Sequence, residues 1–440
     1  MAILACGIAA PLPVLASGFA LQEYSVRDMG TANAGSAAAA ADASTVYANP
    51  AGMMLLDRPQ VTAGASGIFG RARFADTGSR DAAGQPLAGG EGGEFLRDAV
   101  VPNLYAAAPL SERVAIGIGV TAPFGLATRY DDGWVGRYQA IRSKVVTIDV
   151  NPAVAVRVND WLSVGVGASA QYVHVKLSNA VDFGAVCLGR IEPVQPGTCG
   201  PLGLLPQGAD GLADLSGHDW SFGFNAGVLV ELAEGTRIGA QYRSRIRHRV
   251  RGMADFTVPD GALPILPFLG GAFSDTGASA TVGLPARASV SLYHEISPAL
   301  ALMADVTWTE WSRLQAITVA FDNPAQPVQS EPLRYRDTWR AALGAEFHLD
   351  DVWTLRAGGA WDQTPSRQGF RSPRIPDNNR IVAAVGVSAR LGPNLVVDLA
   401  YNHIFIKDSA IERIGTGGDL LLGENTGGAN LVALGATLSF

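Results

Sequence analysis

Five arginines occupy every second position from residue 243 to residue 251, within the run Tyr-Arg-Ser-Arg-Ile-Arg-His-Arg-Val-Arg. Successive side chains of an extended strand point to opposite faces, so all five guanidinium groups are expected on one face. A guanidinium group binds a carboxylate or a phosphate through two parallel hydrogen bonds. Arg243, Arg245 and Arg247 are therefore candidates for binding a ligand carboxylate, and ion pairing with acidic side chains of neighbouring strands is the alternative.

Cys187 and Cys199 flank a stretch that includes Pro193, Pro196 and Gly197. In an exported protein, two cysteines this close together predict a disulfide that closes a short loop. Two free thiols are the alternative. A metal site would need more ligands than this stretch offers.

The residues that usually carry catalysis are not grouped in this sequence. The six histidines are scattered, and none belongs to an HExxH helix or to a set of His and Cys ligands. There is no G-x-S-x-G motif, and the adjacent Asp350 and Asp351 are typical of a solvated turn. We therefore predict a protein that is not an enzyme and that binds no cofactor or metal, with an outer-membrane hydrolase as the alternative.

The composition favours a membrane protein over a soluble one. Of the 440 residues, 48% are hydrophobic and 17% are charged, whereas soluble domains carry about 25% charged residues. The net charge of −7 gives no basis for nucleic-acid binding. No run after the N-terminus reaches the roughly 18 apolar residues of a membrane helix, so a membrane location would require a β-barrel.

Residues 1–16, MAILACGIAAPLPVLA, are predicted to be a signal peptide because they are apolar and end in small residues. The basic segment that normally begins a signal peptide is missing. Either the natural start lies further upstream or the segment is atypical.

Alternation of apolar and polar residues recurs along most of the chain, for example in residues 162–171, 381–389 and 431–440. This pattern is typical of strands with one face towards lipid and the other towards the lumen of an antiparallel transmembrane barrel. A soluble sandwich or propeller is the alternative. We predict about fourteen strands, near residues 58–76, 99–110, 113–122, 143–157, 160–178, 219–233, 236–257, 281–296, 299–322, 333–348, 352–364, 379–391, 394–408 and 429–440.

The connections between these strands alternate between short and long, as they do between the periplasmic and extracellular ends of bacterial outer-membrane barrels. The long ones lie near residues 77–98, 123–142, 179–218, 258–280, 323–332, 365–378 and 409–428. Tryptophans near strand ends predict aromatic belts at the two membrane interfaces: they are Trp161, Trp220, Trp308, Trp311, Trp339, Trp353 and Trp361.

Residues 17–56 have no regular period and are rich in Ala, Gly and Ser. A barrel of this size has a lumen too wide for its own side chains to fill, so we predict that this segment is a plug and that residues 57–440 form the barrel. The segment contains Asn49-Pro50-Ala51, a turn in which Pro50 fixes its φ angle and Asn49 can bond its own backbone.

Several motifs, in this order, carry a resemblance to a known family. They are Gly18-Phe19-Ala20-Leu21-Gln22-Glu23-Tyr24-Ser25, the alanine-rich run with Asn49-Pro50-Ala51, Thr121-Ala122-Pro123-Phe124-Gly125-Leu126, and Gly136-Arg137-Tyr138-Gln139-Ala140. Together they resemble the FadL-type long-chain fatty acid transporters of the outer membrane, whose relatives carry aromatic hydrocarbons. The resemblance covers nearly the whole chain.

The resemblance implies a gated plug, called a hatch, in which Asn49, Pro50 and Ala51 take part in gating; a static seal is the alternative.

The resemblance also implies a kink in the third strand that opens a lateral gap in the wall. Glycine and proline mark irregular strands. The candidates for the kink are Gly117, Gly119 and Pro123, although both glycines could be ordinary spacers.

Two long loops are unusually apolar, and the resemblance implies that they form a first, weak hydrophobic binding site. Exposed apolar patches often mark binding surfaces, although these loops could also pack on each other. The candidate residues are Leu204, Leu205, Leu263, Ile265, Leu266, Phe268 and Leu269.

The predicted function is passive uptake of hydrophobic small molecules, most consistent with long-chain fatty acids, across the outer membrane of a Gram-negative bacterium. The alternatives are a channel for monoaromatic hydrocarbons or alkanes, a polar porin, and a surface adhesin. We expect a monomer that contacts outer-membrane lipid and lipopolysaccharide. The arginine face is expected to point into the lumen, because Tyr242, Ile246 and Val250 on the other face suit lipid.

Overall fold

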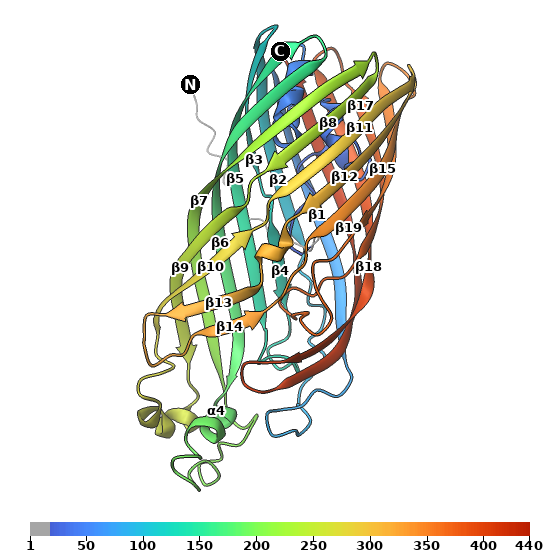
Figure 1. Ribbon diagram of the computed structural model, residues 1–440. Helices are drawn as coiled ribbons and strands as arrows, with labels where there is room; N and C mark the ends of the chain where they lie inside the picture. Colours follow the sequence, from blue (N-terminus) through green and yellow to red (C-terminus); the bar gives the residue numbers. More distant parts are fainter. Residues whose placement is uncertain (1–17) are drawn as a thin grey trace.

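The strands of this chain pair in sequence order until the last strand meets the first, so that the sheet closes into a barrel (Figure 1). The computed structural model describes residues 18–440. The predicted signal peptide, residues 1–16, lies outside the described residues. None of the helices within residues 18–440 is long and apolar enough to cross a membrane.

The described residues form fourteen barrel strands, five of which are interrupted and carry two labels each. The strands are β1 (Gln60–Asp76), β2 (Ala99–Ser111), β3 (Val114–Thr121) with β4 (Gly125–Arg129), β5 (Arg142–Asn159), β6 (Leu162–Asp182), β7 (Asp210–Ala233), β8 (Thr236–Arg243) with β9 (Ile246–Thr257), β10 (Thr276–Leu284) with β11 (Arg287–Ser297), β12 (Leu300–Thr309) with β13 (Ala316–Phe321), β14 (Gln329–Pro332) with β15 (Thr338–His348), β16 (Trp353–Asp362), β17 (Arg380–Arg390), β18 (Leu395–Ile414) and β19 (Leu420–Ser439). This confirms the predicted antiparallel barrel of about fourteen strands.

The alternation of side chains places apolar groups outside and polar groups inside, as the sequence pattern predicted. On β19, Val432 and Leu434 are 45% and 60% exposed, and they point away from the lumen. On β6, Ser163, Ser169 and Gln171 are buried inside. An apolar outer surface on a closed barrel is the arrangement that lipid requires.

The two ends of the barrel differ in the length of their connections. Residues 112–113, 160–161 and 234–235 make short turns at the end that holds the C-terminus. The long loops gather at the opposite end, where α4 (Phe183–Arg190) and the 3-10 helix η2 (Asp260–Leu269) lie (Figure 1).

Residues 18–56, the hatch, lie inside the barrel near the end with the short turns (Figure 1). They form three single-turn helices and one 3-10 helix: α1 (Val26–Met29), α2 (Ser36–Ala39), α3 (Thr45–Ala48) and η1 (Pro50–Leu55). Helix α1 contacts β17, β18 and β19, α2 contacts β8 and β11, and η1 contacts β5, β6 and β7. The hatch therefore touches the wall around most of its circumference.

Glycines in the wall let the hatch approach the strands closely. A Cβ atom added to Gly165 would lie 2.5 Å from the backbone nitrogen of Ala51, and one added to Gly117 would lie 2.5 Å from Cγ2 of Val46. Both distances are shorter than real contacts of a Cβ atom. These two positions accept only glycine unless the hatch moves away from the wall.

Candidate functional site

Asn49 connects two parts of the hatch to each other and to the barrel wall. Its side-chain oxygen accepts a hydrogen bond from the backbone nitrogen of Ala51 at 3.1 Å, which caps η1. Its side-chain nitrogen donates to the carbonyl of Ala37 at 2.7 Å and to the carbonyl of Val228 in β7 at 3.0 Å. Asn49 is completely buried, so no water replaces these bonds when the side chain is removed.

Arginines of the wall hold other parts of the hatch. Arg340 donates to the carbonyl of Ala32 at 2.6 Å, and Arg157 donates to the carbonyl of Met54 at 2.5 Å. In the other direction, Arg27 of the hatch forms an ion pair of 2.7 Å with Glu346 of β15. Charge-assisted bonds of this kind are stronger than neutral ones, so they fix the hatch at defined points on the wall.

The third barrel strand is interrupted between β3 and β4, and the start of the hatch fills the interruption from inside. The backbone of Leu21 donates to the carbonyl of Pro123 at 2.9 Å, and the backbone of Gly125 donates to the carbonyl of Phe19 at 2.9 Å. These bonds replace some that β2 would otherwise provide. Within the described residues, the pairing of β2 with β3 ends at Leu104 and Val120.

The interruption lies at residues 122–124, and of the three residues predicted to form a kink it contains only Pro123. Gly117 and Gly119 lie in regular pairs with β2 and β5. The prediction for these two glycines is therefore corrected. They face the hatch and Tyr105, where a Cβ atom would collide, which explains the absence of side chains.

Four aromatic rings from separate elements meet where the hatch begins. The ring of Trp311, in the short 3-10 helix η3 (Trp311–Arg313), lies 4.9 Å from Phe19, 6.1 Å from Phe124 and 5.9 Å from Tyr335. Trp311 is fully buried, so its predicted place in an interface belt is wrong. The interruption of the ninth barrel strand, between β12 and β13, turns the side chain of Trp311 into the lumen. There the ring packs against Phe19 of the hatch and Phe124 of the wall.

Beside this aromatic cluster the lumen contains a cavity, the central cavity, whose non-atom space of about 610 Å³ includes open solvent. Its apolar lining comes from the hatch, from the third strand and from the next interrupted strands: Ala20, Pro123, Phe124, Ile246, Leu284 and Pro285. Gln22 and Tyr47 of the hatch also line it, so a ligand bound there would touch the hatch directly.

Three arginines line the central cavity, and each of them has at least one guanidinium nitrogen without a hydrogen-bond partner among the described residues. Arg243 lies over the ring of Tyr47 at 4.0 Å, and Arg287 donates to the side chain of Gln22 at 3.0 Å. Nε and Nη1 of both Arg243 and Arg340, and Nε of Arg287, find no hydrogen-bond acceptor among the described residues. Buried donors without acceptors are costly. Negative charge is already present nearby, because Arg243 Nη1 lies 3.9 Å from Asp149 and the carboxyl group of Asp362 also lines the cavity.

The other candidates of the arginine face point outwards. Arg243 is buried in the lumen, whereas Arg245 and Arg247 are exposed on the outer surface. Between β8 and β9 the chain holds one residue more than β7 opposite, because Asn225 pairs with Arg243 but His218 pairs with Arg251. An extra residue of this kind reverses the alternation, so the prediction that Arg245 and Arg247 bind a carboxylate in the lumen is wrong.

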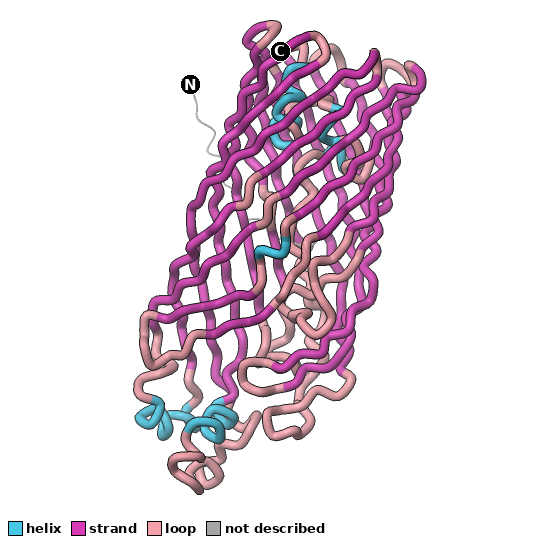
Figure 2. Tube along the Cα trace, viewed as in Figure 1, coloured by secondary structure: helices cyan, strands magenta, loops and turns pink. Residues whose placement is uncertain are grey.

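One signal for this reversal was present in the sequence of the neighbouring strand. Pro285 lies opposite the interruption, between β10 and β11, and a proline cannot donate a bond to the strand beside it. Figure 2 shows the interruptions of neighbouring strands as loop-coloured breaks that follow one another across the wall. The central cavity lies behind this band, and residues 244, 246, 284 and 285 belong to its lining.

The two apolar outer loops are packed together through part of their candidate residues. Leu204, Ile265 and Leu269 are buried in a common cluster that includes Phe183. Leu205, Leu263 and Phe268 are 55%, 50% and 53% exposed, and Leu266 is half-buried. The candidates thus divide into residues that hold the loops together and residues that remain free to meet a hydrophobic ligand.

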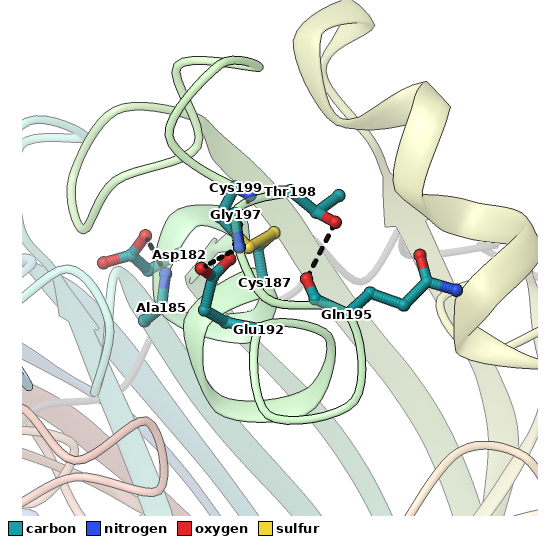
Figure 3. The surroundings of a disulfide bond; sticks show 8 residues. All are labelled: Asp182, Ala185, Cys187, Glu192, Gln195, Gly197, Thr198 and Cys199. Atoms are coloured by element: carbon teal, nitrogen blue, oxygen red, sulfur yellow. Dashed lines mark hydrogen bonds between the residues drawn. A yellow bond between two sulfur atoms is a disulfide. The ribbon is translucent and has the colours of Figure 1, made fainter.

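A disulfide joins Cys187 of α4 to Cys199, with the two Cα atoms 5.9 Å apart (Figure 3). The carboxylate of Glu192 accepts hydrogen bonds from the backbone nitrogens of Cys199 at 3.0 Å and of Gly197 at 2.6 Å. These backbone donors stabilise the charged form and lower the pKa of Glu192 below its ordinary value. The bridge and the carboxylate together fix the shape of this loop.

Residues 18–440 contain no group of three or more His, Cys, Asp or Glu side chains that could hold a metal ion.

A family model, a relative and a solved structure each match most of this chain. The family model described as outer membrane protein transport protein (OMPP1/FadL/TodX) matches residues 8–440. The long-chain fatty acid transport protein of Escherichia coli (strain K12) is 30% identical over 399 residues, which cover 88% of this chain and 87% of that protein. The crystal structure of a Pseudomonas aeruginosa FadL homologue, 27% identical, has a TM-score of 0.89 and covers 96% of this chain and 100% of its own.

The Pseudomonas putida toluene transporter TodX is also similar in structure, with a TM-score of 0.72, 17% identity, and coverage of 97% of this chain and 100% of its own. At this identity the similarity shows the shared fold alone.

Proposed function

Because the chain belongs to the outer membrane protein transport protein family (OMPP1/FadL/TodX), whose members transport hydrophobic substrates across the outer membrane, we propose that its substrate is a long-chain fatty acid. The chain is a multi-pass protein of the Gram-negative outer membrane. The name of the Escherichia coli relative supports the proposal, as does the similarity over nearly the whole chain. Transport is passive and follows the concentration gradient of the ligand.

One observation carries the choice of substrate. The lining of the central cavity combines apolar residues with Arg243, Arg287 and Arg340, which have unused hydrogen-bond donors. A fatty acid matches both kinds of lining. Its alkyl chain can pack against the apolar residues, and its carboxylate can accept hydrogen bonds from the arginines. A hydrocarbon would leave the buried guanidinium donors without an acceptor, which costs binding free energy.

A channel for aromatic hydrocarbons is the second candidate, favoured by the ring cluster of Phe19, Phe124, Trp311 and Tyr335 at the start of the hatch. Aromatic rings pack well against one another and against aromatic ligands. An open polar porin is disfavoured, because the hatch occupies the lumen through which polar solutes would pass. No structural feature of the described residues favours an adhesin.

The route begins at the exposed apolar residues of the outer loops, continues through the central cavity, and ends at the interruption of the third strand. Ligand in the cavity touches Gln22 and Tyr47, and it can shift the hatch only if it binds the moved state more tightly. Movement of Phe19 and Leu21 away from Pro123 and Gly125 would free the edge of the third strand. The ligand would then leave sideways into the membrane.

The test compares substrates in a strain that lacks its own transporters of this family. The strain carries this protein or an empty vector and grows on oleate, on toluene or on hexadecane as the carbon source. We expect the protein to restore growth on oleate at limiting concentration. Restoration of growth on toluene or hexadecane, but not on oleate, would contradict the proposal and favour the hydrocarbon channel.

A further inference from the structure

Four arginines form a line on the outer surface of the wall, one directly before β9 and three within it. Arg245, Arg247, Arg249 and Arg251 are all exposed, and the buried residues that alternate with them point into the lumen. Alternate residues of a strand are about 7 Å apart. These four side chains, the outer arginine stripe, therefore present four like charges at regular spacing on the side of the barrel that faces lipid.

The outer arginine stripe lacks the acidic partners that other outer arginines have. On β1, Arg71 pairs with Asp98 and Arg73 pairs with Glu94, both at 2.8 Å. Within residues 18–440, no carboxylate forms an ion pair with a member of the stripe. The nearby Asp219 accepts a hydrogen bond from the backbone nitrogen of Arg249 at 3.0 Å and bonds the ring of His248 at 3.1 Å, but it forms no ion pair with a guanidinium group of the stripe.

Other positive charges lie on β5 and β6, the two strands that precede β7 in the sheet. Lys144 of β5 lies opposite Lys176 of β6 in the register, and both are partly exposed. Lys176 forms an ion pair with Asp214 at 3.2 Å, so Lys144 is the lysine that adds positive charge to this face of the wall. Like charges in a row repel one another unless anions lie between them.

The surroundings of the stripe place it at a membrane interface. His218, Asp219 and Trp220 of β7 share a surface hollow with Arg249 and Arg251. Trp220 is 55% exposed and its ring lies 5.4 Å from that of Tyr172, as expected of an aromatic belt. On the other side, Ser279 and Thr281 of β10 are too short to cover the guanidinium groups.

The stripe belongs to the half of the barrel that leads to the long loops. Strand β9 runs from the middle of the wall to η2, at the end where α4 lies (Figure 1). Long loops are extracellular in barrels of this kind. Arg249 and Arg251, the two members nearest the long loops, therefore lie closest to the headgroups of the outer leaflet. Arg245 and Arg247 lie at the level of the exposed apolar side chains of Phe224 and Phe222.

We infer that the outer arginine stripe binds the phosphate groups of lipid A, the phosphorylated glycolipid that anchors lipopolysaccharide in the outer leaflet. Arginine pairs with phosphate through two parallel bonds, and a phosphorylated lipid supplies the anions that the stripe lacks. The acyl chains would lie along Phe222 and Phe224. This site lies on the outside of the wall and does not depend on which substrate passes through the lumen.

The test measures binding of lipid A to the full-length protein, extracted from outer membranes in mild detergent and followed by native mass spectrometry. The probe is bisphosphorylated lipid A in detergent micelles. The variant R249S/R251S removes the two guanidinium groups at the end of the stripe nearest the long loops. The matched control R71S/R73S removes two outer arginines that already have carboxylate partners.

We expect R249S/R251S to bind lipid A at least about tenfold more weakly than the wild type, since hydrogen bonds to charged groups contribute this much each. R71S/R73S should bind like the wild type, and R249K/R251K should lose less than R249S/R251S because the charge remains. All variants must show the heat-dependent shift in electrophoretic mobility of an assembled barrel. Equal binding by R249S/R251S and the wild type would overturn the inference, as would equal losses in both serine variants.

Two further probes identify the source of the phosphate. Lipid A with both phosphates removed should bind to the wild type as weakly as bisphosphorylated lipid A binds to R249S/R251S. Inorganic phosphate at millimolar concentration should not displace bisphosphorylated lipid A. Tight binding of the dephosphorylated lipid, or complete displacement by inorganic phosphate, would overturn lipid A phosphate as the ligand.

Discussion

The side-chain amide of Asn49 donates a hydrogen bond of 3.0 Å to the backbone carbonyl of Val228, and this contact joins the hatch to β7. The same amide group donates to Ala37 within the hatch. One side chain therefore holds the fold of the hatch and its position on the wall together. A change at residue 49 should affect both, which makes it a sensitive point at which to test whether the hatch seals the lumen.

Replacing Asn49 with Ala should increase the leak of small ions through the barrel. The carbonyls of Ala37 and Val228 lose their donor, at a cost of roughly 1–3 kcal/mol for each buried group. Single-channel conductance in planar bilayers measures the leak. Asn323→Ala is the matched control, because its amide donates to the carbonyl of Gly271 in a neighbouring outer loop at 2.8 Å, far from the hatch. Wild-type conductance in Asn49→Ala would mean that the seal does not depend on this contact.

Replacing Ala122 with Trp should reduce the uptake of labelled oleate while leaving assembly intact. Ala122 lies in the interruption between β3 and β4, where the proposed lateral exit needs open space. The control is Ala106→Trp, the same change at a position of β2 that is paired with Ile118 of β3. If both variants take up oleate equally well, lateral exit at this strand is excluded.

Replacing Arg287 with Met should weaken oleate binding by about tenfold, the loss expected for a hydrogen bond to a charged group. Arg287 suits this test because its recorded bond is to the side chain of Gln22 and not to the hatch backbone. Fluorescence titration with a labelled fatty acid measures the affinity. Arg113→Met, at an exposed turn, should have no effect. An unchanged affinity in Arg287→Met would remove this guanidinium from the carboxylate site.

The loop closed by the disulfide should become more mobile in acid. The lowered pKa of Glu192 means that its bonds to Cys199 and Gly197 stabilise the loop at neutral pH and are lost as the pH falls through the folded-state pKa, which lies below the ordinary value of 4.5. Hydrogen exchange of the amides of residues 197 and 199, corrected for the intrinsic effect of pH, measures the change. In Glu192→Gln, protection should already be reduced at neutral pH and should not change further in acid. Equal protection in both proteins at every pH would contradict this role of Glu192.

The orientation of the barrel can be tested with single cysteines and an impermeant maleimide on whole cells. A cysteine at Gly261, in η2, has no heavy atom within 4 Å of its Cβ position and should be labelled. A cysteine at Asn159, next to a short turn, should be labelled only after the outer membrane is broken. The reverse result would invert the barrel in the membrane.

Much of the barrel could be predicted because two-residue alternation is a local property. In residues 431–440 the pattern alone separates the exposed Val432 and Leu434 from the buried Leu431 and Ala433. The plug was also predictable, since residues 17–56 have no strand pattern and a wide lumen has to be filled. These inferences require only that neighbouring residues point to opposite sides.

The central cavity could not be predicted, because its residues meet only through interruptions of the strands. One extra residue at 244–245 places Arg243 inside and Arg245 outside, and the alternation on either side gives no sign of this change. Trp311 was assigned to the membrane surface for the same reason. Its orientation depends on a single turn of 3-10 helix, for which the sequence around it has no clear cap.

The seam between the first and last strands determines when the barrel can be completed. Residue 60 pairs with residue 439 and residue 76 with residue 423, so the seam joins the two parts of the barrel wall that are furthest apart in the chain. Contacts between such distant residues carry a large loop-closure entropy and tend to form slowly. Until the last strand arrives, β1 and β18 expose long unpaired edges that can recruit strands from other chains. A protein truncated before residue 420 should therefore remain an open sheet that depends on chaperones in the periplasm, however well its other strands are paired.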